Sequence, residues 1–491
     1  MKPHRPIAQG ISAALLVLIC TLVGSAAVLA DSTIKGVLVR HRTDTPIIYA
    51  PDFVSPVAFG VAMNDAGDMV GTSYTDTGCG PFCLPPFETV VWKAGIRIVL
   101  PSVPGFTGTT VTGINNKGWI SGSAGVSGFG HAVVWKPKRN TYIAIDLGVL
   151  PGTAHSIAIG IDDTNRVVGY ATASSGLQTP FMWTKAEGMV DLTKRGFPNE
   201  VPLGISSGGT VATYGHWYHL GESTSVTAMT PAPPGGWFVV NAPVAINDAG
   251  DQARGLGIGT EHPFTFIYRY HHEGTGTWQQ IDFTGTGPQS RGGIGSINDA
   301  QDITNTVSGA AQIAYGPDGL NQSLTALFSP AYNSAIIGGG PMNASNQILA
   351  QIMVGLSGRL MRLTPTSACE TSCIRVSALR LNAKFHQDPN DPGHCTLGND
   401  EEYNLVHARA TVTNETGARL SGVLVSGRFM DQYWTSALVS GTTDAKGTVQ
   451  FKFKGPCGVG TESFIVENAI KAPLVFDKAV GMLTGSALPK F

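Results

Sequence analysis

The chain has 491 residues, which is too long for one ordinary hydrophobic core and predicts two or more domains. Only 13% of the residues are charged and 62 are Gly, a composition that excludes a long solvated coil and favours a fold rich in turns. The formal net charge is −2 and Lys and Arg form no run, so the sequence lacks the electrostatic pattern of a nucleic-acid-binding protein.

The N-terminus has the pattern of an export signal. Lys2 and Arg5 supply positive charge, residues 11–22 are almost wholly apolar, and residues 28–30 form a cleavage site of the small-residue type. We therefore expect residues 1–30 to be removed as a signal peptide; an uncleaved membrane anchor is the alternative. No later stretch reaches the roughly 20 apolar residues that span a bilayer. The mature protein is expected to be secreted, periplasmic or at the cell surface, without insertion into the membrane.

A motif of the form Ile-Asn-(Asn/Asp)-x-Gly recurs seven times, as in GINNKGWISG at 113–122. The position four after each apolar anchor is Gly or Asn in six repeats and Gln301 in the other. Gly and Asn adopt the left-handed backbone conformation at low energy, so each motif predicts a hairpin corner between two strands. Gln301 fits this pattern poorly, and we expect a different turn there. The anchors are Met63, Ile114, Ile161, Ile205, Ile246, Ile297 and Met342.

Each corner is followed by further strand patterns, such as HAVVW at 131–135 and IAIDLG at 143–148. Four short strands in each repeat are typical of a propeller blade, and one such sheet cannot bury both its faces alone. We therefore predict an all-β fold with a seven-bladed β-propeller over residues 31–366. Segment 33–51 is expected to complete the seventh blade and close the ring. A ring of six or eight blades, or an open solenoid, is the alternative.

The cycle of corner, strand, His-Ala and DLG-LPG, best seen at 113–152, resembles the bacterial HAF-type extracellular repeat. The His-Ala-aromatic element is kept only in part, at 131–133 and 262–264. The resemblance covers about residues 57–365. It implies an exported bacterial repeat protein and does not imply a specific activity.

After Pro365 the repeat stops, and alternating apolar and polar residues predict roughly seven short strands. Turn signals fall at 414–417 and 444–447. We predict an immunoglobulin-like β-sandwich over residues 367–491. This part resembles the bacterial immunoglobulin-like and carboxypeptidase-regulatory-like modules that are appended to secreted proteins.

Six cysteines remain if Cys20 leaves with the signal peptide, an even number that favours disulfides in an oxidising compartment. Two pairs of cysteines are close in sequence, and for that reason we expect each of them to form a disulfide. The last two cysteines are then left to pair with each other. Zinc is the alternative, but neither close pair has a His near it in sequence. The expected disulfides are Cys79–Cys83, Cys369–Cys373 and Cys395–Cys457.

Few residues point to chemistry. His216 and His219 lie in a strand pattern, where they would face opposite sides and could not chelate one ion. Trp217 or Tyr218 could line a sugar-stacking surface if exposed, and they are our candidate binding residues. The acidic segment 388–402 could bind Ca²⁺, but it lacks EF-hand spacing and is better interpreted as a solvated loop. No nucleophile elbow, zinc motif, phosphate loop or dinucleotide fingerprint is present.

The sequence therefore predicts a secreted, monomeric binding protein without catalytic residues, metal or cofactor. Loops at the propeller mouth would recognise an unidentified protein or glycan. The alternative is an exported glycan-active hydrolase or lyase with its site at the axial mouth, where carboxylates from several blades could converge. A purely structural envelope protein is the third hypothesis.

Overall fold

A computed structural model describes residues 48–55, 58–74, 87–93, 96–126, 129–221, 226–228, 244–258, 264–271, 277–280, 292–307, 310–316, 321–327, 335–354, 357–366, 369–386, 403–430, 436–456 and 461–490. Strands dominate their regular structure. The helical elements assigned within these ranges are the short 3-10 helix η1 (Leu192–Arg195) and α2 (Leu324–Leu327). In this part of the chain, no helix is both long enough and apolar enough to cross a bilayer.

The repeat region forms consecutive four-stranded antiparallel sheets, one for each repeat. The first three sheets are β2 (Ala58–Met63), β3 (Met69–Tyr74), β4 (Phe87–Lys93) and β5 (Ile96–Val99); β6 (Thr109–Ile114), β7 (Ile120–Val126), β8 (Phe129–Lys138) and β9 (Thr141–Asp146); and β10 (His155–Ile161), β11 (Val167–Thr172), β12 (Gln178–Thr184) and β13 (Gly188–Asp191). The next three are β14 (Gly204–Ile205), β15 (Thr210–Ala212), β16 (His216–His219) and β17 (Val226–Ala228); β18 (Val244–Ile246), β19 (Gln252–Ile258), β20 (Phe264–His271) and β21 (Thr277–Gln280); and β22 (Gly292–Ile297), β23 (Ile303–Val307), β24 (Ala310–Ala314) and β25 (Asn321–Ser323).

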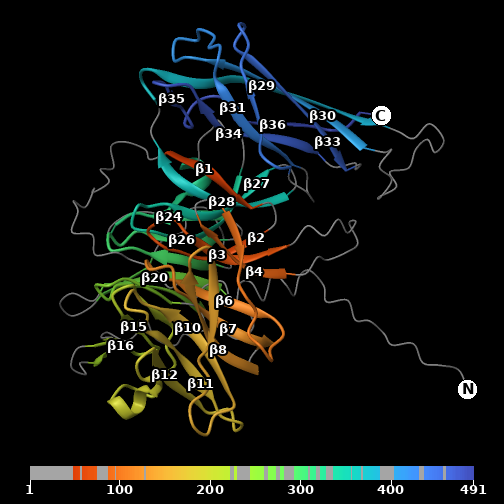
Figure 1. Cartoon of the computed structure of the whole chain (residues 1–491). Helices are drawn as coiled ribbons and strands as arrows, with labels where there is room; N and C mark the ends of the chain where they lie inside the picture. The colour runs from red at the N-terminus through yellow and green to blue at the C-terminus, as the bar shows by residue number, and fades with distance from the viewer. Residues whose placement is uncertain are drawn as a thin grey trace, which may run out of the picture.

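The seventh sheet joins the two ends of the repeat region. It has the order β1-β28-β27-β26, in which β26 (Ala335–Met342), β27 (Ile348–Val354) and β28 (Ser357–Thr366) are completed by β1 (Ile48–Ser55). β1 pairs antiparallel with β28, and Figure 1 shows the two strands side by side. The first strand of each sheet contacts the first strand of the next, and β26 contacts β2. The described part of the repeat region is therefore all-β and propeller-like, with its ends joined through strands.

Each predicted corner is a turn of the same geometry. The residue after the anchor donates its backbone N–H to the carbonyl four positions on, and the Gly or Asn position donates back, as in Asn115 N to Trp119 O (3.0 Å) and Gly118 N to Asn115 O (2.9 Å). The prediction of a different turn at Gln301 was wrong. Gln301 has a φ of 62° and makes the same bond to Asn298 O (2.9 Å), because the turn's hydrogen bonds outweigh the strain of a left-handed non-Gly residue.

Apolar cores lie between neighbouring sheets. Trp135 and Val111 of the second sheet, for example, share one cluster with Val70 of the first. The closing junction has its own cluster, in which Trp92 of the first sheet packs with Leu349 and Leu360 of the seventh. Trp92 and Trp135 are nearly completely buried, and burial of such side chains contributes about 2–3 kcal/mol each. Stacking of sheets, as the repeat pattern predicted, provides the hydrophobic core.

The C-terminal segment forms two further four-stranded sheets that pack on a shared apolar core. In this core the Phe464 ring stacks on Phe451 and makes a tilted contact with Phe429. In Figure 1 these strands lie beyond β1, β27 and β28, and one apolar cluster spans residues of both regions. The first sheet has the order β33 (Thr448–Pro456), β30 (Tyr403–Thr413), β29 (Cys373–His386) and β35 (Val475–Phe476), and the second has β32 (Val439–Thr442), β31 (Leu424–Met430), β34 (Glu462–Ile470) and β36 (Thr484–Ala487).

The turn signals in this segment are confirmed. Gly417 and Gly447 have φ values of 86° and 67°, and each donates its N–H to the carbonyl three residues earlier. The Cys369–Cys373 disulfide is present, with a Cα–Cα distance of 5.8 Å. The other four predicted disulfide cysteines, Cys79, Cys83, Cys395 and Cys457, lie outside the described residues, as does the acidic segment 388–402.

Candidate functional site

The corners form a ring at the inner edge of the sheets, because each follows a first strand and the first strands contact one another in sequence. Within a corner, the polar residue after the anchor accepts a hydrogen bond from the N–H four positions on, as Asn115 Oδ1 does from Trp119 N (2.9 Å). Its Nδ2 then donates to the next corner, to Asp162 O (2.7 Å). One amide side chain thus closes its own turn and holds its neighbour.

The same bond occurs at three further corners. Asn64 Nδ2 donates to Asn115 O (3.1 Å), and Asn247 Nδ2 donates to Asn298 O (3.2 Å). At the closing junction, Asn343 Nδ2 donates to Asn64 O (3.2 Å). The repeated Asn is therefore explained by the contact between sheets as well as by the turn itself.

The following position makes a second set of bonds between corners. The backbone N–H of Asn116 donates to Asp163 Oδ1 (2.8 Å), and its side chain donates to Asp65 on one side (2.7 Å) and to Asp163 on the other (2.9 Å). Asp248 accepts in the same way from Gly208 N (2.5 Å) and from Ser207 Oγ (3.2 Å). The corner carboxylates act as hydrogen-bond acceptors for the adjacent sheet.

Burial is the main electrostatic influence on these carboxylates. It raises the pKa of Asp163, although hydrogen bonds from Asn116 oppose the shift. It likewise raises the pKa of Asp248 against the hydrogen bonds from Ser206 and Gly208, and the charge of Asp299 adds to the rise. Among the described residues, no group of three or more His, Cys, Asp or Glu is placed to hold a metal ion. The corner carboxylates therefore hold neighbouring sheets together through hydrogen bonds.

The two predicted binding residues lie on β16. Tyr218 is completely buried, and the centre of its ring lies 4.5 Å from that of Phe197. It cannot line an exposed surface, so the prediction of Tyr218 as a binding residue was wrong. Trp217 is half-buried and packs against Val244 and Ile246 of the next sheet. A Cβ atom at Gly250 would lie 3.4 Å from the Trp217 ring. The β16 aromatics therefore serve mainly to join sheets.

The two histidines diverge, as the strand pattern predicted. His216 Nδ1 hydrogen-bonds with Glu200 Oε1 (2.9 Å), whereas His219 Nδ1 hydrogen-bonds with Thr210 Oγ1 (2.9 Å). They have different partners and do not form a common site. Glu222, three residues after His219, lies outside the described residues.

An exposed aromatic side chain that the sequence reasoning missed lies beside this cluster. Tyr214 occupies the turn between β15 and β16, and 52% of its surface is accessible. Its position next to Gly215 between two strands was the available signal, since a turn residue in a hairpin is directed to solvent. The neighbouring His-Trp-Tyr-His run at 216–219 is the more conspicuous feature of this part of the sequence.

The backbone of the Tyr214 turn is held from two sides. Arg254 of the next sheet, itself only 1% exposed, donates to Tyr214 O (2.8 Å) and to Thr213 O (2.5 Å). Glu200 accepts from Thr213 Oγ1 (2.5 Å) and from Gly215 N (3.2 Å). The turn therefore presents its aromatic ring from a fixed backbone.

The pKa of Glu200 is lowered in this environment. Partial burial acts to raise the pKa of Glu200, but the hydrogen bonds from Thr213 and Gly215, together with nearby His216, outweigh it and hold the pKa below its usual value. A carboxylate and an imidazole therefore hydrogen-bond to each other next to the backbone of the Tyr214 turn.

No family model and no curated protein matches the chain. Several solved structures are similar over much of its length. The extracellular domain of a hybrid two-component system from B. thetaiotaomicron aligns with 87% of this chain and 56% of its own, at a TM-score of 0.36 and 11% identity. A post-proline cleaving enzyme from Rickettsia typhi aligns with 73% of this chain and 49% of its own, at 0.31 and 11%.

A gluconolactonase from Xanthomonas campestris aligns over its full length with 67% of this chain, at a TM-score of 0.28 and 9% identity. The chain spans about half the length of the first two structures. The similar structures thus include an extracellular domain and two enzymes.

Proposed function

We propose that the protein is an exported binding protein, without catalytic activity, that recognises a glycan or protein ligand through the turns at one mouth of a seven-bladed propeller. Residues 1–30 would be a signal peptide, and residues 31–366 would build the propeller from HAF-type repeats. Residues 367–491 would form an immunoglobulin-like sandwich that serves as a spacer or second binding module.

The observation that supports this proposal is the exposed ring of Tyr214 on a turn fixed by Arg254 and Glu200. An aromatic face can stack on the apolar side of a sugar ring or on a partner's side chain. A backbone that is already ordered loses little entropy when the ligand binds, so the contact is favourable. Glu200 and His216 could then hydrogen-bond to ligand hydroxyl groups beside the ring.

The rival function, a glycan-active hydrolase at the axial mouth, needs two carboxylates that are free to act as acid and base or nucleophile. The described carboxylates Asp65, Asp163 and Asp248 instead accept hydrogen bonds from the neighbouring corner. Their arrangement supports a structural role, which leaves recognition as the better proposal.

The test is a glycan array probed with the full chain and with Tyr214→Ala, followed by affinity measurement on each glycan bound. We expect Tyr214→Ala to weaken binding by roughly tenfold, the effect of losing one aromatic contact. Leu177→Ala is the matched control, because Leu177 is 61% exposed on the equivalent turn of the preceding sheet. Release of shorter sugars from a bound glycan would favour the hydrolase, and equal binding by both variants would remove Tyr214 from the site.

A further inference from the structure

The outer face of the C-terminal sheet β33-β30-β29 carries cations and no acidic residue. These three strands contain no Asp or Glu anywhere in their sequence. Their apolar residues point into the sandwich core, and the alternate positions face solvent. The exposed cations on this face, which we call the basic face, are Arg380, Lys384, Arg409, Lys452 and Lys454.

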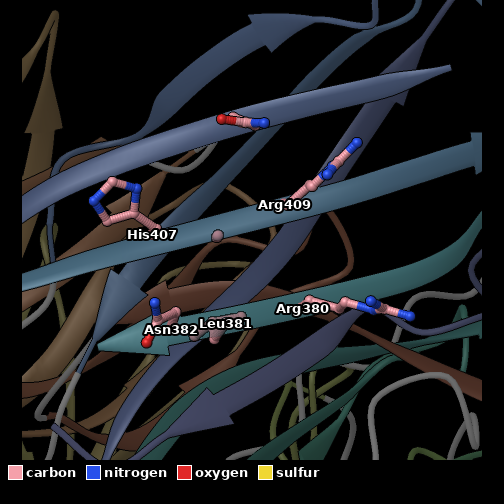
Figure 2. A pocket seen from close by; sticks show the side chains of 7 residues that line it. Arg380, Leu381, Asn382, His407 and Arg409 are labelled. Carbon is pink, nitrogen blue, oxygen red and sulfur yellow. The ribbon is translucent and has the colours of Figure 1, made fainter. Parts of the chain in front are cut away.

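Strand register brings these residues together from positions far apart in the sequence. Arg380 on β29 lies directly opposite Arg409 on β30, which in turn lies opposite Gln450 on β33. Two residues along the strands, Asn382, His407 and Lys452 form the next row. Figure 2 shows the first two strands of this arrangement, with Arg380 and Asn382 on one strand and His407 and Arg409 on its neighbour. The two rows border a shallow hollow of about 340 Å³.

A third row extends the charge toward the end of the sheet. Lys384 lies opposite Leu405, which lies opposite Lys454. On the other side, Lys384 forms a parallel bridge with Lys490. This row lies four residues from the Arg380 row, a separation of roughly 13 Å at the usual rise along a strand. The cations therefore form a strip along the strands.

The basic face is electrostatically unfavourable in the free protein. Within the part of the chain that the structure describes, Arg380, Arg409, Lys384 and Lys452 make no ion pair. Like charges directly opposite each other on neighbouring strands destabilise a sheet, and Arg380 with Arg409 is such a pair. The isolated bridge between Lys384 and Lys490 brings two further like charges together. Elsewhere on the same domain, arginines do have acidic partners, as in Arg375 with Asp477 (2.9 Å) and Arg428 with Glu467 (2.7 Å). A bound anion would relieve the repulsion.

We propose that the basic face binds an acidic polysaccharide whose sugars carry carboxylate groups. The guanidinium groups of Arg380 and Arg409 can each pair with a carboxylate through two hydrogen bonds. Asn382 and Gln450 alternate with the cations and offer amide groups to sugar hydroxyls. A uronic-acid polymer, which presents carboxylates and hydroxyls along one chain, matches this alternation along the strip.

Single-stranded nucleic acid is the main alternative polyanion, and the face does not offer what it needs. Such ligands rely on aromatic rings onto which bases stack. Among the described residues of β29, β30 and β33, Tyr403 is the one Phe, Tyr or Trp at a solvent-facing position. Lys454 Nζ lies 3.9 Å from the centre of the Tyr403 ring, and the His386 ring lies 4.6 Å from it. The ring is therefore already in contact with protein groups.

This proposal is independent of the Tyr214 site and is tested with the full chain. The probe is polygalacturonic acid, measured by calorimetry at low and high salt, with neutral dextran and a thymidine oligonucleotide as comparison ligands. The test variant is Arg380→Gln/Arg409→Gln. The control is Lys138→Gln/Lys185→Gln, which removes the same charge from exposed positions on the repeat region.

We expect the wild type to bind polygalacturonic acid, with binding weakened by salt because the charges are exposed. The double Arg variant should bind roughly tenfold more weakly or worse, and the control should be nearly unchanged. The Arg variant should unfold at the same or higher denaturant concentration, since it loses a like-charge pair. Absence of wild-type binding, equal losses in both variants, or preference for the oligonucleotide would each overturn the proposal.

Discussion

The side-chain amide of Asn343 donates a hydrogen bond to the backbone carbonyl of Asn64, 279 positions earlier in the chain, at 3.2 Å. Asn343 also uses its Oδ1 to accept from Gln347 N (3.0 Å) inside its own turn. One residue therefore links the last repeat to the first while it stabilises a local corner. The two roles can be separated by mutation, because Ser206 shows that a Ser at this position keeps the local bond (3.0 Å).

Asn343→Ser should lower the free energy of unfolding by about 1 kcal/mol or more, since it removes the donor to Asn64 O and to Gln347 Oε1 (2.9 Å) and keeps an acceptor for the turn. Urea denaturation of the full chain measures the change. Asn414→Ser is the matched control, because Asn414 makes the same local bond to Ala418 N (2.8 Å) on an exposed turn. Similar losses in both variants would show that the contact between repeats contributes nothing of its own.

Gly118 has a φ of 75°, and an added Cβ would lie no closer than 3.9 Å to its neighbours. Substitution there tests backbone conformation almost without steric clash. We expect Gly118→Ala to destabilise the protein by about 1–2 kcal/mol, the usual cost of a left-handed L-residue. Gly118→Asn should lose clearly less, since Asn165 and Asn346 occupy the equivalent position with φ values of 68° and 55°. Thermal unfolding of both variants measures the loss of stability. Equal losses in the two variants would show that backbone conformation is not the cause.

Glu200 should make stability depend on pH in the acidic range. Its pKa in the folded protein lies below the usual value, so the ionised form stabilises the fold. That contribution is present above the unfolded-state pKa and is lost as the pH falls through the lower folded-state pKa. We expect the unfolding free energy of Glu200→Gln to fall less steeply at acidic pH than that of the wild type. A curve parallel to that of the wild type would contradict the assignment.

Asp248 should show the opposite sign. Burial raises its pKa in the folded protein, so stability from this group is present at low pH and declines as the pH rises through the folded-state pKa. Asp248→Asn should therefore stabilise the protein at neutral pH, with Oδ1 still able to accept from Gly208 N. The gain should shrink toward acidic pH, where the wild-type carboxyl is protonated. Denaturation at pH 7 and at pH 4 would measure it, and a loss of stability at pH 7 would count against the account.

The corners could be predicted because their geometry is set within five residues. A short polar side chain and a Gly or Asn at fixed spacing make the turn locally, and the spacing recurs wherever the turn does. The bonds between corners could not be predicted in the same way. Nothing in the sequence near Asn64 indicates that its carbonyl meets the side chain of Asn343, since that contact depends on how the sheets are stacked.

The two candidate binding surfaces likewise depend on packing between strands and sheets that the sequence does not show. The sequence drew attention to Tyr218, which is buried, because strand alternation alone does not say which face meets the next sheet. The basic face was missed because Arg380, Arg409 and Lys452 belong to three different strands, so they form no charge run along the chain. The alternation of Arg and Lys with apolar residues within each strand was the available signal.

The hydrogen bonds from the asparagine after each anchor to the next corner's backbone carbonyl have the same direction. At Asn64, Asn115, Asn247 and Asn343 the donor belongs to the earlier repeat and the acceptor to the later one, and the last repeat donates to the first. These four bonds therefore run head to tail, including the one that closes the repeat region. A gene rearranged so that translation starts in another repeat would preserve every one of these bonds. Loss of a single repeat would instead leave a donor and an acceptor too far apart to meet.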